Sequence, residues 1–232
     1  VEDHELCGSV IRGQDRLALQ LGLSVVTGQP FLDGASKQGR VLYMALEDNE
    51  RRLQERIRVA QCGWPCDLKF MCDTAELDEL DLGRWRLVII DTLGRWRPLS
   101  STQYNYAADI KVLAEVQRKA LRADCAILLI HHTNKTFRAT DWQATISGTE
   151  GLAGTADTTM VLRRRRNQKT AQLCATGRDI EENEIRLRIN EKTRMAEAAV
   201  PVDTETNADR LLEALPEDGL EIAAVDLVES SE

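Results

Sequence analysis

The sequence predicts an α/β fold in which a mainly parallel sheet carries helices on both faces and continues into an antiparallel extension. Apolar runs of strand length alternate with segments of helical periodicity along the first part of the chain. After Asp157, short strand-like segments follow one another across polar turns, which is typical of antiparallel pairing. Aromatic residues make up only 4% of the chain, so the core must be mostly aliphatic, which suits a layered α/β protein.

The individual elements follow from the spacing of apolar residues. Leu17, Ala18, Leu21 and Val25 recur at helical spacing and predict a helix over 15–26, which the turn at 28–30 closes. Further helices are expected over 50–60 and 106–121. Buried strands of the parallel part are expected over 41–46, 68–72, Leu87–Asp91 and Ala126–His131, and antiparallel strands over 158–162, 170–175 and 184–189.

Charge divides the chain into two parts. The net charge is −8, and residues 201–232 hold ten acidic residues against Arg210, which makes −9, so residues 1–200 sum to +1. We expect one core domain over 1–200, followed over 201–232 by an acidic linker and the start of a truncated small helical unit, with helices at 208–215 and 222–227. A near-neutral core with basic clusters leaves nucleic acid open as a partner. The apolar runs are far shorter than the roughly 20 residues of a membrane span.

Polar residues end three of the expected parallel strands. Glu47 follows the first, Asp91 ends the second, and His131 and His132 close the third. A lone polar residue at such a place is most often a cap, but ligands of parallel α/β sheets bind at the carboxyl ends of the strands. We therefore predict that Glu47, Asp91 and His132 lie together near the start of the helix at 15–26.

The strand that ends in Asp91 has the pattern of the magnesium-side strand of P-loop nucleotidases. Its partner motif, G-x-x-x-x-G-K-[ST], must lead into a helix that offers its N-terminus to phosphate. The sequence contains two G-x-x-x-x-G spacings. The one at 34–39 is rejected because it leads into an expected strand. The one from Gly8 to Gly13 leads into an expected helix, but Gln14 and Asp15 occupy the positions of the lysine and the hydroxyl residue.

Together these segments resemble the RecA-like ATPases of the RepA plasmid-helicase family, which are similar to hexameric replicative helicases. The resemblance covers about residues 8–190 and rests on the order and spacing of segments 42–49, 87–95, 129–135 and 146–157. It implies a RecA-like three-layer sandwich and a ring of identical subunits such as a hexamer. The resemblance also implies ATP and Mg²⁺ at the subunit interfaces, and single-stranded DNA in the central channel during plasmid replication. A cytoplasmic location is expected because the six cysteines lie in or beside apolar segments, which suits reduced thiols.

The resemblance implies roles by position. Glu47 would activate the attacking water, Asp91 would be the magnesium-side carboxylate, and His132 would sense the γ-phosphate. The residues expected to contact the nucleotide are Gly8, Arg12, Gly13, Gln14 and Asp15. Asp15 is also expected to contact the magnesium ion.

The departure from the P-loop pattern predicts a degraded nucleotide site. A P-loop lysine places a positive charge on the phosphates, and the following hydroxyl binds magnesium. Gln14 is neutral, and Asp15 adds a negative charge close to the phosphates. The alternative interpretation is that Asp15 caps the helix and the site has become purely structural.

Two basic segments are candidates for further contacts. Arg163 and Arg164 open a basic run after the strand at 158–162, where an arginine can reach a neighbouring subunit's γ-phosphate; the alternative is a solvated basic turn. Lys135, Arg138 and Trp142 lie in a long polar loop and suit single-stranded DNA by charge and stacking; the alternative is a loop that merely packs Trp142.

Three functions therefore remain open: an active ATP-driven helicase, a non-hydrolysing DNA-binding or assembly subunit, and a RecA-like regulator of protein partners. A zinc site at Cys62, Cys66 and Cys72 is disfavoured, because no fourth ligand lies near them in the sequence.

Overall fold

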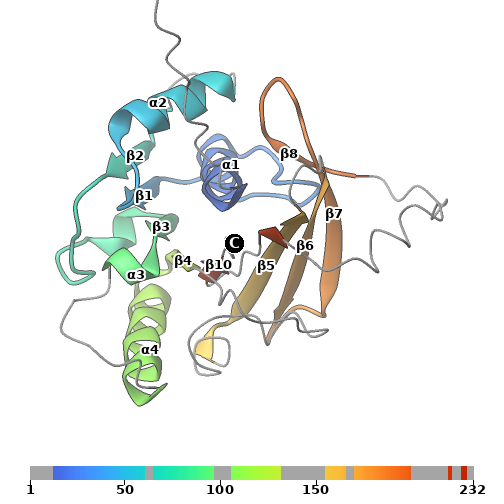
Figure 1. Ribbon diagram of the computed structural model, residues 1–232. Helices are drawn as coiled ribbons and strands as arrows, with labels where there is room; N and C mark the ends of the chain where they lie inside the picture. The colour runs from blue at the N-terminus through green and yellow to red at the C-terminus, as the bar shows by residue number, and fades with distance from the viewer. Residues whose placement is uncertain are drawn as a thin grey trace, which may run out of the picture.

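The computed structural model describes residues 13–60, 65–96, 106–131, 155–165, 170–199, 219–220 and 226–228. Its parallel strands are β1 (Val41–Ala45), β2 (Leu68–Met71), β3 (Leu87–Asp91), β4 (Ala126–His131) and β10 (Asp226–Val228). The antiparallel part contains β5 (Thr158–Arg165), β6 (Thr170–Gly177), β7 (Asn183–Ile189), β8 (Ala196–Ala198) and β9 (Gly219–Leu220). They form one sheet in the order β2-β1-β3-β4-β10-β5-β6-β7-β8, with β9 paired to β5 (Figure 1).

The parallel strands end level with one another. Ala45 of β1 lies opposite Asp91 of β3, and Asp91 lies opposite Ile130 of β4. Because three neighbouring strands stop at the same edge, the residues that follow them come together there. This register positions the candidate site.

Helices cover both faces of the parallel part, as the sequence predicts. On one face, α1 (Gly13–Thr27) and α2 (Glu50–Val59) pack their apolar side chains against alternate strand residues such as Tyr43 and Ile89. On the other face, α3 (Leu93–Trp96), the 3₁₀ helix η1 (Leu82–Arg84) and α4 (Tyr106–Ala123) pack against the intervening residues, such as Val88 and Ile90. The buried side chains are mainly aliphatic, so this prediction is confirmed as well.

Local sequence signals explain where the helices nearest the site begin and end. The side chain of Asn49 caps α2 by accepting a hydrogen bond from the backbone N–H of Arg52 at 3.1 Å. Helix α1 ends at Thr27, and Gly28 follows with φ of +70°, a conformation that glycine adopts without strain.

Two expectations about the second half of the chain are wrong. Strand β5 continues through Arg165 instead of stopping at residue 162, so Arg163 and Arg164 are strand residues and not part of a turn. Residues 226–228 form a strand where a helix over 222–227 was expected, because they pair with both β4 and β5. The other expected helix, at 208–215, lies outside the described residues. Among the described helices, none is long and apolar enough to cross a bilayer.

Candidate functional site

Three acidic side chains gather at the carboxyl ends of β1 and β3. Asp91 ends β3 and is buried, Glu47 lies just beyond β1, and Asp15 lies in the first turn of α1. Burial, and then the negative charges of Asp15 and Glu47, raise the pKa of Asp91 to about 8. Asp91 is therefore mostly protonated near neutral pH.

The hydroxyl of Tyr43 stabilises Asp91 from within the core. It donates a hydrogen bond to Oδ2 of Asp91 at 2.8 Å, and the Tyr43 side chain is completely buried. Burial, followed by the nearby charge of Asp91, raises the pKa of Tyr43 well above its usual value, so the phenol keeps its proton. This hydrogen bond opposes the rise in the pKa of Asp91.

Arg56 joins two carboxylates beside this acidic group. Its Nη2 lies 3.0 Å from Oδ2 of Asp15, and its Nη1 lies 2.6 Å from Oδ2 of Asp48. The side chains of Arg56, Asp15 and Asp48 are 18%, 12% and 6% exposed, so water screens these contacts only weakly. Burial alone would lower the pKa of Arg56, but Asp15 and Asp48 raise it. This Asp15–Arg56–Asp48 bridge ties the start of α1 to α2 and to the end of β1.

Glu47 is held in place but stays accessible. The hydroxyl of Thr92, a buried residue, donates to Oε1 of Glu47 at 3.0 Å, and Nε of Arg95 lies 3.7 Å from the same oxygen. The Glu47 side chain is 25% exposed. It can therefore meet a molecule that enters from solvent.

Gln14 brings no charge to the start of α1. The residue is 1% exposed, and neither its amide nitrogen nor its amide oxygen has a hydrogen-bond partner among the described residues. Buried polar groups normally have such partners. Gly13 begins the helix, whereas the other two expected nucleotide contacts, Gly8 and Arg12, lie outside the described residues.

The structure thus brings Glu47, Asp91 and Asp15 together near the start of α1, as expected from the strand ends. His131 ends β4 beside them, next to Ile130, which lies opposite Asp91. His132 lies outside the described residues, as do Lys135, Arg138 and Trp142. Arg163 and Arg164 are half-buried in β5, which contradicts the interpretation of these two residues as a solvated turn.

Sequence reasoning missed Tyr43 and Arg56. Arg56 carries a readable signal, because it lies on the same side of α2 as Leu53 and Ile57, both buried. A charged residue on an apolar helix face usually needs a buried partner. Tyr43 gives no comparable signal, since it reads as one more apolar residue of a buried strand.

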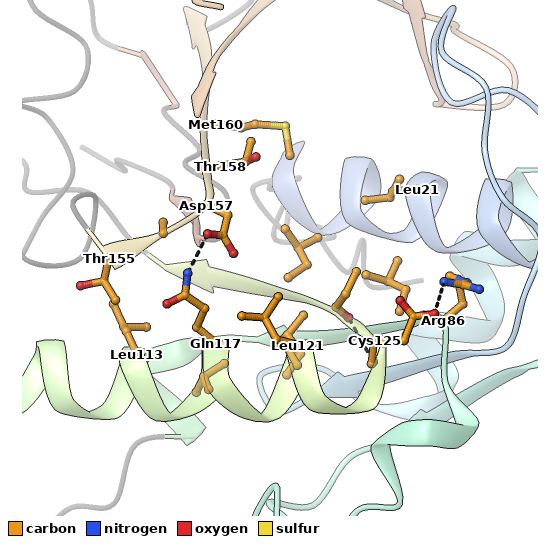
Figure 2. Close-up of a pocket in the computed structure, with 18 residues that line it drawn as sticks. Leu21, Arg86, Leu113, Gln117, Leu121, Cys125, Thr155, Asp157, Thr158 and Met160 are labelled. Carbon is orange, nitrogen blue, oxygen red and sulfur yellow. Dashed lines mark hydrogen bonds and ion pairs between the residues drawn. The ribbon is translucent and has the colours of Figure 1, made fainter. Parts of the chain in front are cut away.

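A cavity of about 550 Å³ lies away from this site, between α1 and α4 (Figure 2). It opens between the amino-terminal parts of β4 and β5, because β10 pairs only with residues 129–131 of β4 and 160–161 of β5. Its lining is mostly apolar, with a hydrogen bond of 2.6 Å from Gln117 to Asp157 at one end. None of the residues that the sequence singled out for chemistry lines it.

The described residues show no zinc site. Cys66 and Cys72 are exposed free thiols, and Cys72 lies just after β2 instead of inside a buried strand as expected. Cys62 lies outside the described residues.

Comparison with known proteins identifies the domain type. A family model described as an AAA domain matches residues 16–139, slightly more than half of the chain. A search of curated proteins for relatives in sequence finds no match.

Solved structures with the same fold include a DnaB-like replicative helicase, solved to show its interactions with primase. It has a TM-score of 0.62 and 11% identity over 82% of this chain, which spans 56% of that protein. The RadB recombinase has a TM-score of 0.52 and 14% identity over 81% of this chain and 87% of that one. A further solved ATPase domain has a TM-score of 0.58 and 10% identity over 78% and 80% of the two chains. These likenesses confirm the RecA-like fold.

Proposed function

Since the chain belongs to the AAA-domain family, we propose that it is a RecA-like ATPase domain of the RepA helicase type with impaired ATP hydrolysis, and that it acts on single-stranded DNA in replication. The observation that carries the impairment is the ion pair of 3.0 Å between Asp15 and Arg56 at the start of α1. In an active P-loop, the position of Asp15 holds the hydroxyl that binds magnesium, and the position of Gln14 holds a free lysine.

The residues of the site do not fit a magnesium–nucleotide complex held as in an active P-loop enzyme. Gln14 cannot neutralise phosphate charge, and the Asp15 carboxylate is already paired with Arg56. Asp91, the expected magnesium-side carboxylate, has a pKa raised to about 8. Within the described part of the chain, no three His, Cys, Asp or Glu side chains are placed so that they could hold a metal ion together. This set of residues supports the proposal of impaired hydrolysis.

The resemblance to RepA-type helicases supports DNA as the partner and self-association in a ring. The loop with Lys135, Arg138 and Trp142 has the basic and aromatic side chains that single-stranded DNA needs. In this proposal the core covers residues 1–200 together with β10, which lies between β4 and β5, and the acidic side chains of the segment 201–232 compete with DNA for basic surface.

A titration of a labelled oligonucleotide with the full chain tests the DNA proposal. Binding should weaken with salt, with a log–log slope of about −0.7 for each phosphate contact, because contacts release condensed counterions. Lys135→Ala or Arg138→Ala should reduce this slope. Trp142→Ala should cost roughly 1–3 kcal/mol of binding and leave the slope nearly unchanged, because stacking does not depend on charge.

Replacement of the acidic residues in 201–218 by their amides provides the control for the acidic segment, because it keeps β9 and β10 in the sheet. This change should tighten binding more at low salt than at high salt, because salt screens charge interactions. If the full chain and the neutralised chain both assemble but neither binds the oligonucleotide at low salt, the DNA proposal fails. A regulator of protein partners would then be the better account.

A further inference from the structure

The sheet contains a slot between the amino-terminal halves of β4 and β5. Strand β10 pairs with residues 129–131 of β4 and 160–161 of β5, so it holds these two strands about two strand spacings apart. Among the described residues, no strand pairs with residues 126–128 of β4 on the side that faces β5. The cavity of about 550 Å³ lies in this slot (Figure 2).

Apolar side chains from both helical layers line the slot. Leu21 of α1 and Leu128 of β4 belong to the packing on one face of the sheet, and Leu113 and Val116 of α4 belong to the packing on the other. Leu113, Val116 and Leu128 are at most 6% exposed, so the inner part of the slot is shielded from water. A cavity of this size with mostly apolar walls and a few polar groups is typical of small-molecule sites.

The outer end of the slot, at the start of β4, is exposed and carries Arg86. Leu121, which lines this end, is 72% exposed. The main chain of Arg86 is fixed, because its N–H donates to the C=O of Arg40 at 2.8 Å and its C=O accepts from the N–H of Ala126 at 3.0 Å. The strands therefore position a guanidinium group at the entrance of an apolar slot.

The charge of Arg86 is only weakly neutralised. Its Nη1 lies 3.4 Å from Oδ2 of Asp124, and these two side chains are 40% and 93% exposed. An exposed ion pair of this kind contributes little, so an anion can take the place of Asp124. The thiol of Cys125 lines the same end: burial raises its pKa to about 11, and the opposing effect of Arg86 is larger than the contribution of Asp124. Positive charge therefore prevails at the entrance.

The geometry points to a binding site for an amphipathic carboxylate of the fatty-acid class, with its hydrocarbon chain in the slot and its carboxylate on Arg86. A guanidinium offers a fork of N–H donors that matches the two oxygens of a carboxylate. Because the slot is one strand wide, a narrow unbranched chain suits it, and burial of its methylene groups favours binding. The slot is separate from the start of α1, so this inference goes beyond the proposed function and does not depend on it.

Calorimetric titration of the full chain with decanoate, below the concentration at which decanoate forms micelles, tests the site. We expect one decanoate per chain, and Arg86→Gln should weaken binding about tenfold or more, because the charged hydrogen-bonding fork is lost. Arg58→Gln, an exposed change of equal charge on α2, should leave the affinity within about twofold. Ala120→Phe, which fills the slot from α4, should also weaken binding at least tenfold.

Two probes with the same hydrocarbon chain separate the effects of head group and chain. Decanol should bind more weakly than decanoate, and equally well to the unmodified chain and to the Arg86→Gln variant. This comparison tests the site even if Ala120→Phe does not fold.

Three results would overturn the inference: no saturable binding of decanoate, equal binding of decanoate by the Arg86→Gln variant, or binding of decyltrimethylammonium as tight as that of decanoate. It is also overturned if decanoate does not bind and Ala120→Phe disrupts self-association in analytical ultracentrifugation. A second copy of the chain would then cover the slot.

Discussion

Asp91 is the residue whose environment departs most from what the resemblance implies. By that resemblance it would correspond to the carboxylate that faces a metal-bound water in a working P-loop enzyme. Here it is 4% exposed, accepts a hydrogen bond from Tyr43, and has a pKa raised by burial and by Asp15 to about 8. A neutral carboxylic acid at this position attracts a cation much less than a carboxylate does.

The raised pKa of Asp91 predicts a pH-dependent stability. The ordinary pKa is 3.8, so between that value and about 8 the folded chain keeps a proton that the unfolded chain releases. The contribution of Asp91 to stability is therefore complete at low pH, falls by up to about 1.4 kcal/mol per pH unit as the pH rises, and levels off above the folded pKa. Urea unfolding at about pH 6 and about pH 8 measures it.

Asp91→Asn should flatten this dependence, because the amide has no proton to lose. Asp33→Asn, at an exposed residue, serves as the matched control and should leave the dependence unchanged. An Asp91→Asn chain whose stability still falls with the same slope would show that another group holds the proton.

At the scale of elements, α2 is more than a cover for the sheet. Its Arg56 is the partner of Asp15 in α1 and of Asp48 after β1, so three elements depend on one guanidinium. Removing one partner of a buried ion pair leaves the others charged and uncompensated.

Arg56→Met should therefore lower the free energy of unfolding by about 3 kcal/mol. Arg58→Met, on the exposed side of the same helix, should change it by less than about 1 kcal/mol. Because Asp15→Thr removes the charge that Arg56 neutralises, the double variant should lose less stability than the two single losses added, by roughly 0.5–3 kcal/mol. Strict additivity in denaturant unfolding would contradict the bridge.

The elements also show which strands and contacts can be predicted from the sequence. Strands such as β3 and β4 are predicted to the residue, because an unbroken apolar run of this length, bounded by polar residues, is typical of a buried parallel strand. The strand at 226–228 is missed because its pairing with β4 and β5 is a tertiary contact, which no local pattern encodes. For the same reason Glu47 and Asp91 can be placed at one edge, whereas the contact between Arg56 and Asp15, 41 residues apart, cannot.

At the scale of the whole molecule, the fold is RecA-like, while the residues at the start of α1 depart from the P-loop pattern. The residues around the start of α1 instead hold an internal ion pair in place of a free cation and a hydroxyl. A parallel sheet stabilised by two aliphatic layers does not need a bound nucleotide to fold, so such an exchange leaves the architecture unchanged.

Titration of a fluorescent ATP analogue, with and without Mg²⁺, tests the central claim most directly. The unmodified chain should show weak binding with no gain from Mg²⁺, since Gln14 brings no positive charge to the phosphates and Asp15, at the position of the metal-binding hydroxyl, is paired with Arg56. Gln14→Lys combined with Asp15→Thr should restore Mg²⁺-dependent binding, while Asp33→Thr should not. Micromolar, Mg²⁺-dependent binding by the unmodified chain, with no gain in the double variant, would contradict the account.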